Sequence, residues 1–248
     1  MKLKMKLEKA LSLVAAACFI WVGIADQAIA RDDYPYHQSY SVLINNETAG
    51  TETVIEKKDG SGKIISTSEH DILVTDGLAM NRLRFSTRTV FPRGSLVPET
   101  YVNQYKNDQA GNFGDSYDVS ISNGQITRVL TRSGQSSTAV TTLSPDMVIV
   151  DFNIYHQYEN LIRRYDRKKG GMQQFADFIP VIGNDIPMRV TFLGDGTLQL
   201  DQKNIEVSNF RVEFVGIQTV TLAVDRNDRL VVLENPMQDI KVIRKDLF

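Results

Sequence analysis

Apolar and polar residues alternate along most of the chain with a period of two, which is typical of β-strands that bury one face. The clearest example is the segment 82–88, RLRFSTR, in which the arginines fall on one face and the apolar side chains on the other. Roughly a dozen such segments are separated by short stretches rich in Asn, Asp and Gly. The pattern predicts a mainly β fold, a single antiparallel meander that curls into a barrel or half-barrel.

Several turns are predicted from their residue types. Asn123-Gly124 suits the left-handed dihedral angles of a two-residue hairpin turn, so segment 116–122 is expected to pair with 125–131. A wider turn over 45–50 is expected to connect strands 40–44 and 51–55. Further along, Gly194-Asp195-Gly196 is expected to reverse the chain between strands 186–193 and 197–202.

One segment departs from this alternation. Between residues 151 and 169, apolar side chains recur every three or four positions, which predicts an amphipathic helix of about four turns. Its apolar stripe contains Ile154, Tyr155, Tyr158, Leu161, Ile162 and Tyr165. Asp151 is expected to cap its N-terminus, unless the helix begins earlier at Ser144, and Gly170-Gly171 to end it. A central helix with one apolar face is expected to pack against the sheet around it.

The N-terminus has the three regions of a signal peptide. Four lysines precede an apolar stretch over 10–25, and Ala28-Ile29-Ala30 matches a cleavage site. We therefore expect residues 1–30 to be a signal peptide and 31–248 to be a single β-barrel-like domain, periplasmic or secreted. An uncleaved anchor and a lipoprotein modified at Cys18 are the alternatives, but Ala15 stands where a lipoprotein signal has a large aliphatic residue.

Charge and composition narrow the class of protein further. The formal net charge is −2 and stays mildly negative without residues 1–30, which argues against a nucleic-acid partner. Cys18 is the one cysteine, so the exported domain is expected to fold without a disulfide. The terminal Phe248 is typical of outer-membrane barrels, but Asp246 and Arg244 would then face lipid. We do not expect an integral membrane protein.

The sequence contains no evident catalytic signature. It lacks the motifs of serine hydrolases, zinc metalloproteases and dinucleotide-binding proteins. His37, His70 and His156 have no metal-ligand spacing, and Asp151 and His156 are five positions apart, which does not place the two on one helical face. We therefore predict no catalytic residue, no metal and no cofactor, and we expect His156 to have a packing or polar-edge role. An enzyme of unknown reaction is the third hypothesis.

Two groups of residues are candidates for binding. Tyr155, Tyr158, Ile162 and Tyr165 could line a cavity for an apolar ligand, although an aromatic stripe at helical spacing is more often part of a core. Arg82, Arg84 and Arg88 could bind an anionic head group, although a solvated strand face is the commoner role of such a row.

Some of these features resemble a known plan. An opening strand followed by Gly50-Thr51-Glu52, a central helix with the segments YHQY (155–158) and RRYD (163–166), and Gly170-Gly171 before further strands are similar to a group of exported bacterial proteins of unknown function. The plan is more distantly similar to the LolA/LolB-like lipoprotein carriers. That resemblance implies a curved antiparallel sheet around an apolar cavity for acyl chains, and it identifies no functional residue.

These observations favour a non-catalytic periplasmic envelope protein that binds a lipid-like or amphiphilic ligand, such as a lipoprotein acyl chain, inside the barrel. The alternative is a structural or interaction component of the envelope that docks a protein partner. The space between helix and sheet distinguishes the two hypotheses: the apolar stripe either fills the barrel or forms one wall of a pocket.

Overall fold

The computed structural model describes residues 34–76, 79–107 and 113–247. They form one 15-stranded sheet, one α-helix and a short 3-10 helix. The strands are β1 (Tyr36–Ile44), β2 (Glu47–Lys58), β3 (Ile64–Asp76), β4 (Ala79–Phe91), β5 (Thr100–Asn107), β6 (Phe113–Ser122), β7 (Gln125–Arg132), β8 (Gln135–Thr142), β9 (Met147–Val148), β10 (Met172–Ile179), β11 (Asn184–Leu200), β12 (Lys203–Phe214), β13 (Gln218–Val224), β14 (Leu230–Asn235) and β15 (Ile240–Arg244). The helices are α1 (Gln157–Arg164) and η1 (Lys245–Leu247).

The sheet is a meander in which the first and last strands of the described chain are neighbours in the middle. Its strand order is β8-β7-β6-β5-β4-β3-β2-β1-β15-β14-β13-β12-β11-β10-β9, and β1 pairs with β15 in antiparallel register. All neighbours are antiparallel except β9 and β10, which are parallel. The predicted fold, mainly β with a single curled meander and one central α-helix, is confirmed. The sheet does not close, because its two edge strands, β8 and β9, are not paired with each other.

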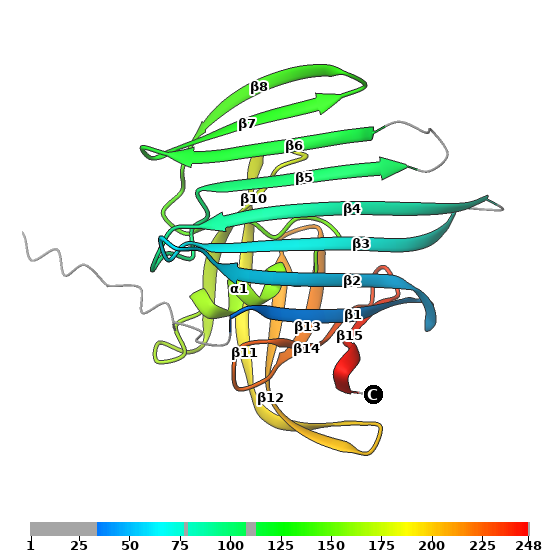
Figure 1. Ribbon diagram of the computed structural model, residues 1–248. Coiled ribbons are helices and arrows are strands. Elements are labelled where there is room, and N and C mark those ends of the chain that lie inside the picture. The colour runs from blue at the N-terminus through cyan, green and yellow to red at the C-terminus, as the bar shows by residue number, and fades with distance from the viewer. Residues whose placement is uncertain (1–33, 77–78, 108–112, 248) are drawn as a thin grey trace, which may run out of the picture.

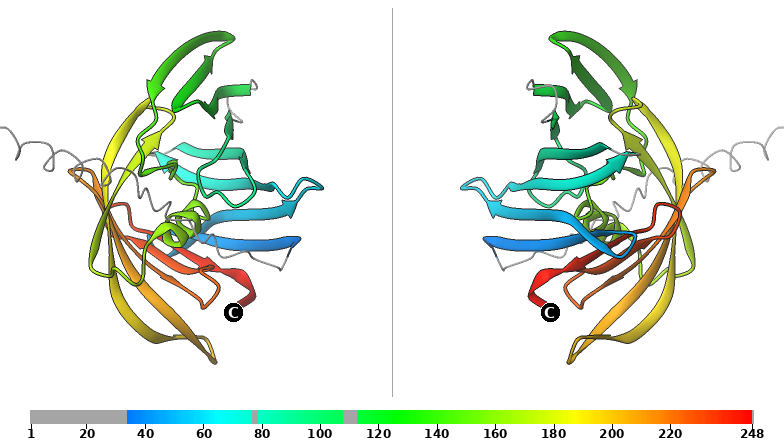
Figure 2. Two further views of the ribbon diagram at one scale, coloured as in Figure 1. Left: turned by 90° about the vertical axis from the view of Figure 1, so that its left-hand side faces the viewer. Right: turned by 90° about the vertical axis from the view of Figure 1, so that its right-hand side faces the viewer.

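Helix α1 lies between the two halves of the curled sheet, with β1 to β5 on one side and β10 to β15 on the other (Figures 1 and 2). The main hydrophobic core surrounds it and includes Leu161 and Ile162. A second core lies where the ends of the sheet approach each other, and there Ile126 of β7 packs with Met147 of β9 and Phe178 of β10. Side-chain packing thus closes the barrel where strand pairing does not.

The first hairpin has a tighter turn than expected. Asn45 and Asn46 alone form it, with φ angles of 53° and 64°, and the strands extend to Ile44 and Glu47 on either side. Asn tolerates the left-handed conformation that both positions of such a turn need. The turn predicted at Asn123-Gly124 is confirmed, with φ angles of 51° and 70°.

The turn predicted at Gly194-Asp195-Gly196 is wrong. Strand β11 continues through these residues to Leu200, and the chain reverses at Asp201, whose φ is 55°. The strand register shifts between Phe192 and Gly194, and Gly194 adopts a φ of 121°. The glycine therefore forms an irregularity within a long strand instead of ending it.

The helix is about half as long as the one predicted from the apolar stripe. It spans Gln157–Arg164, whereas the expected range was 151–169. Asn153 has a φ of 61°, which a right-handed α-helix does not accommodate, and Tyr165 is extended. Asp166 then accepts hydrogen bonds from the backbone N–H groups of Lys168 and Lys169, which forms a turn.

No helix within the described ranges is long and apolar enough to span a membrane. The predicted signal peptide, with its cleavage site at Ala30 and the alternative lipid site at Cys18, lies outside the described residues.

Candidate functional site

The N-terminal end of α1 is held by a carboxylate from the sheet. Glu52 of β2 faces the interior, and its Oε2 accepts hydrogen bonds from the backbone N–H groups of Tyr155 (3.2 Å) and His156 (3.3 Å). Helix N-termini leave such N–H groups without partners and attract negative charge. Asp151, the expected cap, makes no such bond to α1. The cap is supplied from a strand about a hundred residues earlier in the chain.

Two imidazoles flank the same carboxylate. Oε1 of Glu52 lies 2.5 Å from Nδ1 of His156 and 3.0 Å from Nε2 of His70, and strand pairing places Glu52 directly opposite His70 on β3. All three residues are buried, with relative exposures of 0%, 2% and 3% for Glu52, His70 and His156. His156 is therefore an interior residue and not part of an edge of the helix.

The charges in this cluster are coupled. Burial alone would raise the pKa of Glu52, but the imidazoles of His70 and His156 outweigh it and lower that pKa to about 2. Burial would lower the pKa of His156, but the carboxylate of Glu52 reverses the direction and raises it. The cluster is thus an ionised carboxylate that stabilises positive charge beside it.

Asp151 joins the segment before α1 to a second strand of the same half of the sheet, β5. Its Oδ2 accepts hydrogen bonds from the hydroxyl of Tyr101 (2.7 Å) and from Nδ2 of Asn103 (2.9 Å), both on β5. Its backbone N–H donates to Oε1 of Gln157 (2.6 Å) in the first turn of α1. Burial raises the pKa of Asp151, although the hydrogen bonds from Tyr101 and Asn103 oppose this. These bonds fix the lead-in to the helix.

A second buried group of charges holds the other side of α1. Oε1 of Glu159 accepts hydrogen bonds from the hydroxyl of Tyr40 (2.6 Å) and the backbone N–H of Leu230 (2.9 Å). Nη1 of Arg229 lies 2.9 Å from Glu56 Oε2 and 3.5 Å from Glu159 Oε2. Arg163 is an i, i+4 partner of Glu159 at 3.3 Å. Part of the polar side of the helix, around Glu159, is therefore buried as well as the apolar stripe, and hydrogen bonds and arginines supply partners for the Glu159 carboxylate.

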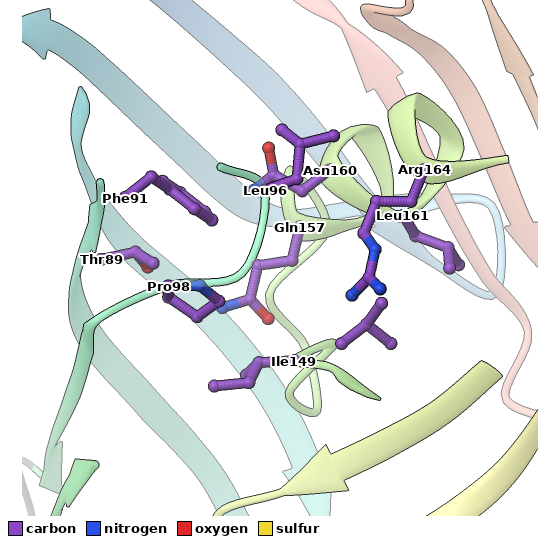
Figure 3. Close-up of a pocket in the computed structure, with 10 residues that line it drawn as sticks. Thr89, Phe91, Leu96, Pro98, Ile149, Gln157, Asn160, Leu161 and Arg164 are labelled. Atoms are coloured by element: carbon purple, nitrogen blue, oxygen red, sulfur yellow. The ribbon is translucent and has the colours of Figure 1, made fainter. Parts of the chain in front are cut away.

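The space between α1 and the sheet is small. A cavity of about 10 Å³ lies between the helix and β4, where Gln157, Leu161 and Arg164 approach Thr89 and Pro98 (Figure 3). A second cavity of about 20 Å³ lies at the start of the helix. Each has room for about one water molecule.

The predicted ligand-cavity residues are all in the core. Tyr155 and Tyr158 line the second cavity, whereas Ile162 and Tyr165 line neither cavity. All four belong to the main hydrophobic cluster, and none is more than 6% exposed. Their side chains pack on the sheet: the ring of Tyr165, for example, contacts the ring of Phe210 edge-on.

The predicted head-group residues lie on the outer face of β4. Arg82 makes a two-point contact with Asp71 of β3, with distances of 2.6 and 2.5 Å, and Arg84 lies 3.8 Å from the same carboxylate. Arg88 is exposed. The row is therefore solvated and, near Asp71, partly neutralised.

The edge strand β8 is a further candidate site. All of its residues are exposed except Thr141, which is half-buried, so neither face of the strand is covered. Its sequence, QSSTAVTT, contains no charge and no proline. Beside it, the hairpin of β7 and β8 borders an open hollow of about 410 Å³ lined by Leu130, Arg132, Ser133, Gln135, Ser136 and Ser137.

Sequence reasoning missed Glu52, His70 and β8. The alternation on β2 places Val54 on one face together with Glu52 and Glu56, and Ile55 on the other, so hydrophobicity alone does not identify the buried face. For β8, the alternating Ser, Thr and Val residues indicate a strand, but its position at the edge depends on the whole topology.

Comparisons with known proteins concern the fold. No family model matches the chain, and neither does any curated protein. Among solved structures, the chain is similar to a beta-barrel-like protein of the domain of unknown function DUF1849 from Brucella abortus. The match covers 84% of this chain and 94% of that chain, with 12% identity and a TM-score of 0.58. It supports a barrel-like fold shared with a protein of unknown function, and it gives no support to the expected LolA/LolB likeness.

Proposed function

We propose that this protein is an exported, non-catalytic component of the cell envelope that docks an extended segment of a partner protein onto edge strand β8. The observation that carries the proposal is the exposure of this uncharged strand on both faces and along its free edge. The expected signal peptide supports the location in the envelope.

The interior of the barrel favours this function over lipid binding. Pockets for small ligands usually enclose about 300–1,000 Å³. The two cavities that border α1 measure about 10 and 20 Å³, and the apolar stripe of the helix fills the space that an acyl chain would need. Of the two hypotheses that the helix raised, the one in which it fills the barrel has the better support.

The two edges of the sheet differ in a way that points to β8. Proteins usually protect an edge strand by keeping it short, by placing charges or proline on it, or by covering it. Edge strand β9 has only two residues, and both are buried. Edge strand β8 has eight residues and none of these protections. Its free backbone N–H and C=O groups can pair with an added strand, the mode known as β-augmentation.

The chemistry of β8 indicates the kind of segment it would accept. Val140 is 57% exposed and is the large apolar side chain of the strand, among Ser and Thr residues. A partner segment would therefore be extended and rich in β-branched or small polar residues, with affinity supplied mainly by backbone hydrogen bonds.

Site-specific photo-crosslinking in cells tests the proposal. A photoreactive residue at Val140 is expected to capture one protein, and peptide mapping should locate the crosslink in a continuous segment of that protein. The same residue at Met237, which is 69% exposed in the turn after β14, is the control. Proline at Thr138 or Val140 should abolish the capture.

Three results would contradict the proposal. Equal capture at Val140 and Met237 would indicate non-specific contact. A crosslink to a second copy of the chain would indicate self-association. A stoichiometric lipid in mass spectra of the purified protein, with no partner at β8, would restore the lipid-binding hypothesis.

A further inference from the structure

Glu52, His70 and His156 bring three metal-binding side chains together from β2, β3 and the start of α1. One ligand atom from each, a carboxylate oxygen or an imidazole nitrogen, lies within 4.8 Å of the other two. Within the described part of the chain, this is the one group of three or more His, Cys, Asp and Glu residues arranged in this way. Spacing along the sequence could not reveal it, because the residues are separated by 18 and 86 positions.

The imidazole nitrogens in this cluster are poorly satisfied by the protein alone. Nδ1 of His70 and Nε2 of His156 are buried without a hydrogen-bond partner. Nε2 of His70 lies 3.0 Å from the Glu52 carboxylate, but it has no hydrogen bond of acceptable direction. Buried polar groups in native proteins nearly always have partners, so the unpartnered Nε2 of His70, which lies beside the Glu52 carboxylate, is a reason to consider a bound ion there. Nδ1 of His70 and Nε2 of His156 are the other nitrogens of the two rings, and an ion between the rings and Glu52 does not satisfy them.

We propose that Glu52, His70 and His156 form a binding site for a divalent transition-metal ion of the Zn²⁺ type. Glu52 Oε1, His70 Nε2 and His156 Nδ1 would be the ligands. Imidazole nitrogen and carboxylate oxygen are donors that Zn²⁺ prefers, and two His with one carboxylate is a common protein ligand set for such ions. The inference does not depend on docking at β8.

The geometry is close to what such an ion needs. Zn–ligand bonds of about 2.0–2.2 Å in a tetrahedral arrangement place ligand atoms about 3.3 Å apart. The distance from Glu52 Oε1 to His70 Nε2 is 3.0 Å, and the distance to His156 Nδ1 is 2.5 Å. The two imidazole nitrogens lie within 4.8 Å of each other. Side-chain shifts of about 1 Å would bring the three atoms to this spacing, with the ion taking the place of the proton between Glu52 and His156.

The surroundings orient the ligands. Oε2 of Glu52 is held by two backbone N–H groups, which leaves Oε1 directed at both imidazoles. The ring of His70 packs against the rings of Phe85 and Tyr155. These contacts preserve the orientation of Glu52 and His70, as outer contacts do in metal sites, whereas the second ring nitrogens of His70 and His156 have no hydrogen-bond partner among the described residues.

A metal in this position would join β2, β3 and α1 at one point. The predicted mature chain has no cysteine and therefore no disulfide to perform that task. Because the ligands are buried, the ion would have to enter while the chain folds, and binding would add to the stability of the folded state.

The test measures metal directly. Protein produced from the full-length sequence without a polyhistidine tag is unfolded in urea with a chelator, then refolded with excess Zn²⁺ or Co²⁺ and desalted. Elemental analysis is expected to find one ion per chain, and the Co²⁺ form should show the visible absorption of a low-symmetry site. The melting temperature should be higher for refolding with Zn²⁺ than with the chelator.

Variants locate the ion. His70→Asn and Glu52→Gln are each expected to lower the metal content at least tenfold and to remove the visible Co²⁺ band. His37→Asn changes the third histidine of the chain, which is exposed on β1, and should leave both signals unchanged. If the buried variants fail to fold, X-ray absorption of wild-type protein decides, because two imidazole ligands are expected and only His70 and His156 can supply them within one buried site.

Two results would overturn the inference. Wild-type protein refolded with Zn²⁺ and Co²⁺ could contain substoichiometric metal, in which case the cluster binds protons only. Alternatively, the ion could be retained equally by His70→Asn and wild type, which would place it elsewhere.

Discussion

The strands around α1 and the hairpin of β7 and β8 belong to the same sheet, but polar side chains are buried in the first region and exposed in the second. Around α1 even charged side chains are buried, and each half of the sheet contributes partners to the helix: Glu159 accepts hydrogen bonds from Tyr40 of β1 and from Leu230 of β14. On β8 nearly every side chain is exposed, and strand pairing with β7 holds it in place. The difference separates two tasks: contacts at the helix stabilise the fold, whereas the hairpin leaves backbone groups free for a partner.

The largest effect is expected where a buried charge loses its partner. Arg229→Met would leave Glu56 and Glu159 buried without their closest shared cation and should lower the free energy of unfolding by about 3–5 kcal/mol. Urea denaturation measures it. Arg189→Met is the control: Arg189 and its partner Glu213 are each 40% exposed, so the loss should stay below about 1 kcal/mol. Equal losses would mean that burial around α1 adds nothing to such pairs.

The second-largest loss of stability is expected when a side chain of the apolar stripe is truncated. Leu161 is 1% exposed between the helix and the sheet, and Leu161→Ala is expected to cost about 2–5 kcal/mol, from lost burial and the cavity left behind. Val140→Ala on β8 should change the free energy of unfolding by less than about 0.5 kcal/mol. A loss at Leu161 as small as that at Val140 would show that the helix stands off the sheet.

The pH dependence of stability should report on Asp177 of β10, which faces the segment before α1. Burial raises its pKa well above the usual value, so the folded state holds the proton more tightly than the unfolded state. The folded state is therefore destabilised as pH rises above the unfolded pKa of about 3.9. Asp177→Asn removes this loss and should be more stable than wild type by about 1–3 kcal/mol at pH 7, with a smaller difference at pH 4. Thermal melts across this range measure it.

A destabilised Asp177→Asn variant would contradict this prediction, and one hydrogen bond would explain the result. The Asp177 carboxylate accepts a hydrogen bond from the backbone N–H of Val150 at 2.8 Å. If the variant were less stable than wild type and the gap grew with pH, the ionised carboxylate would be a net stabiliser through that bond.

The smallest effect on stability is expected at β8, where the effect on binding should be complete. Val140→Lys places a charge on the exposed edge strand, as protected edges have, and should change the free energy of unfolding by less than about 0.5 kcal/mol. It should nevertheless abolish capture of the partner by a photoreactive residue placed at Thr138, the neighbouring position on the same face of β8. Retained crosslinking would show that the partner does not pair with this edge.

The strands were more predictable from sequence than the site. Period-two alternation in 82–88 and the Asn123-Gly124 turn are local signals, and local backbone preferences suffice to interpret them. The predicted helix was too long because the apolar stripe continues into the turns before and after α1, and these turns pack on the same core as the helix. The apolar stripe identifies buried residues: Ile154 and Tyr155 are buried although they precede the helix and follow Asn153, whose φ of 61° is not that of a right-handed helix.

The cluster of Glu52, His70 and His156 could not be predicted from the sequence, for a different reason. Glu52 and His70 become neighbours through the pairing of β2 with β3, and His156 joins them only when α1 packs inside the sheet. A buried carboxylate looks like a solvated one in sequence, because its partners are set by tertiary structure. The exposure of β8 has the same origin, since an edge is defined by the strand that is missing beside it.

The pairing of β1 with β15 has a consequence for the order of folding. Residues 40–44, near the start of the described chain, pair with residues 240–244, near its end, in the middle of the sheet. A chain that emerges N-terminus first can form the hairpins of β1 to β8 early, but β1 keeps a free edge until the last strand arrives. Contacts so distant in sequence form slowly, and unpaired edges favour aggregation in the meantime. The middle of the sheet is therefore completed only when β15 has been synthesised and pairs with β1.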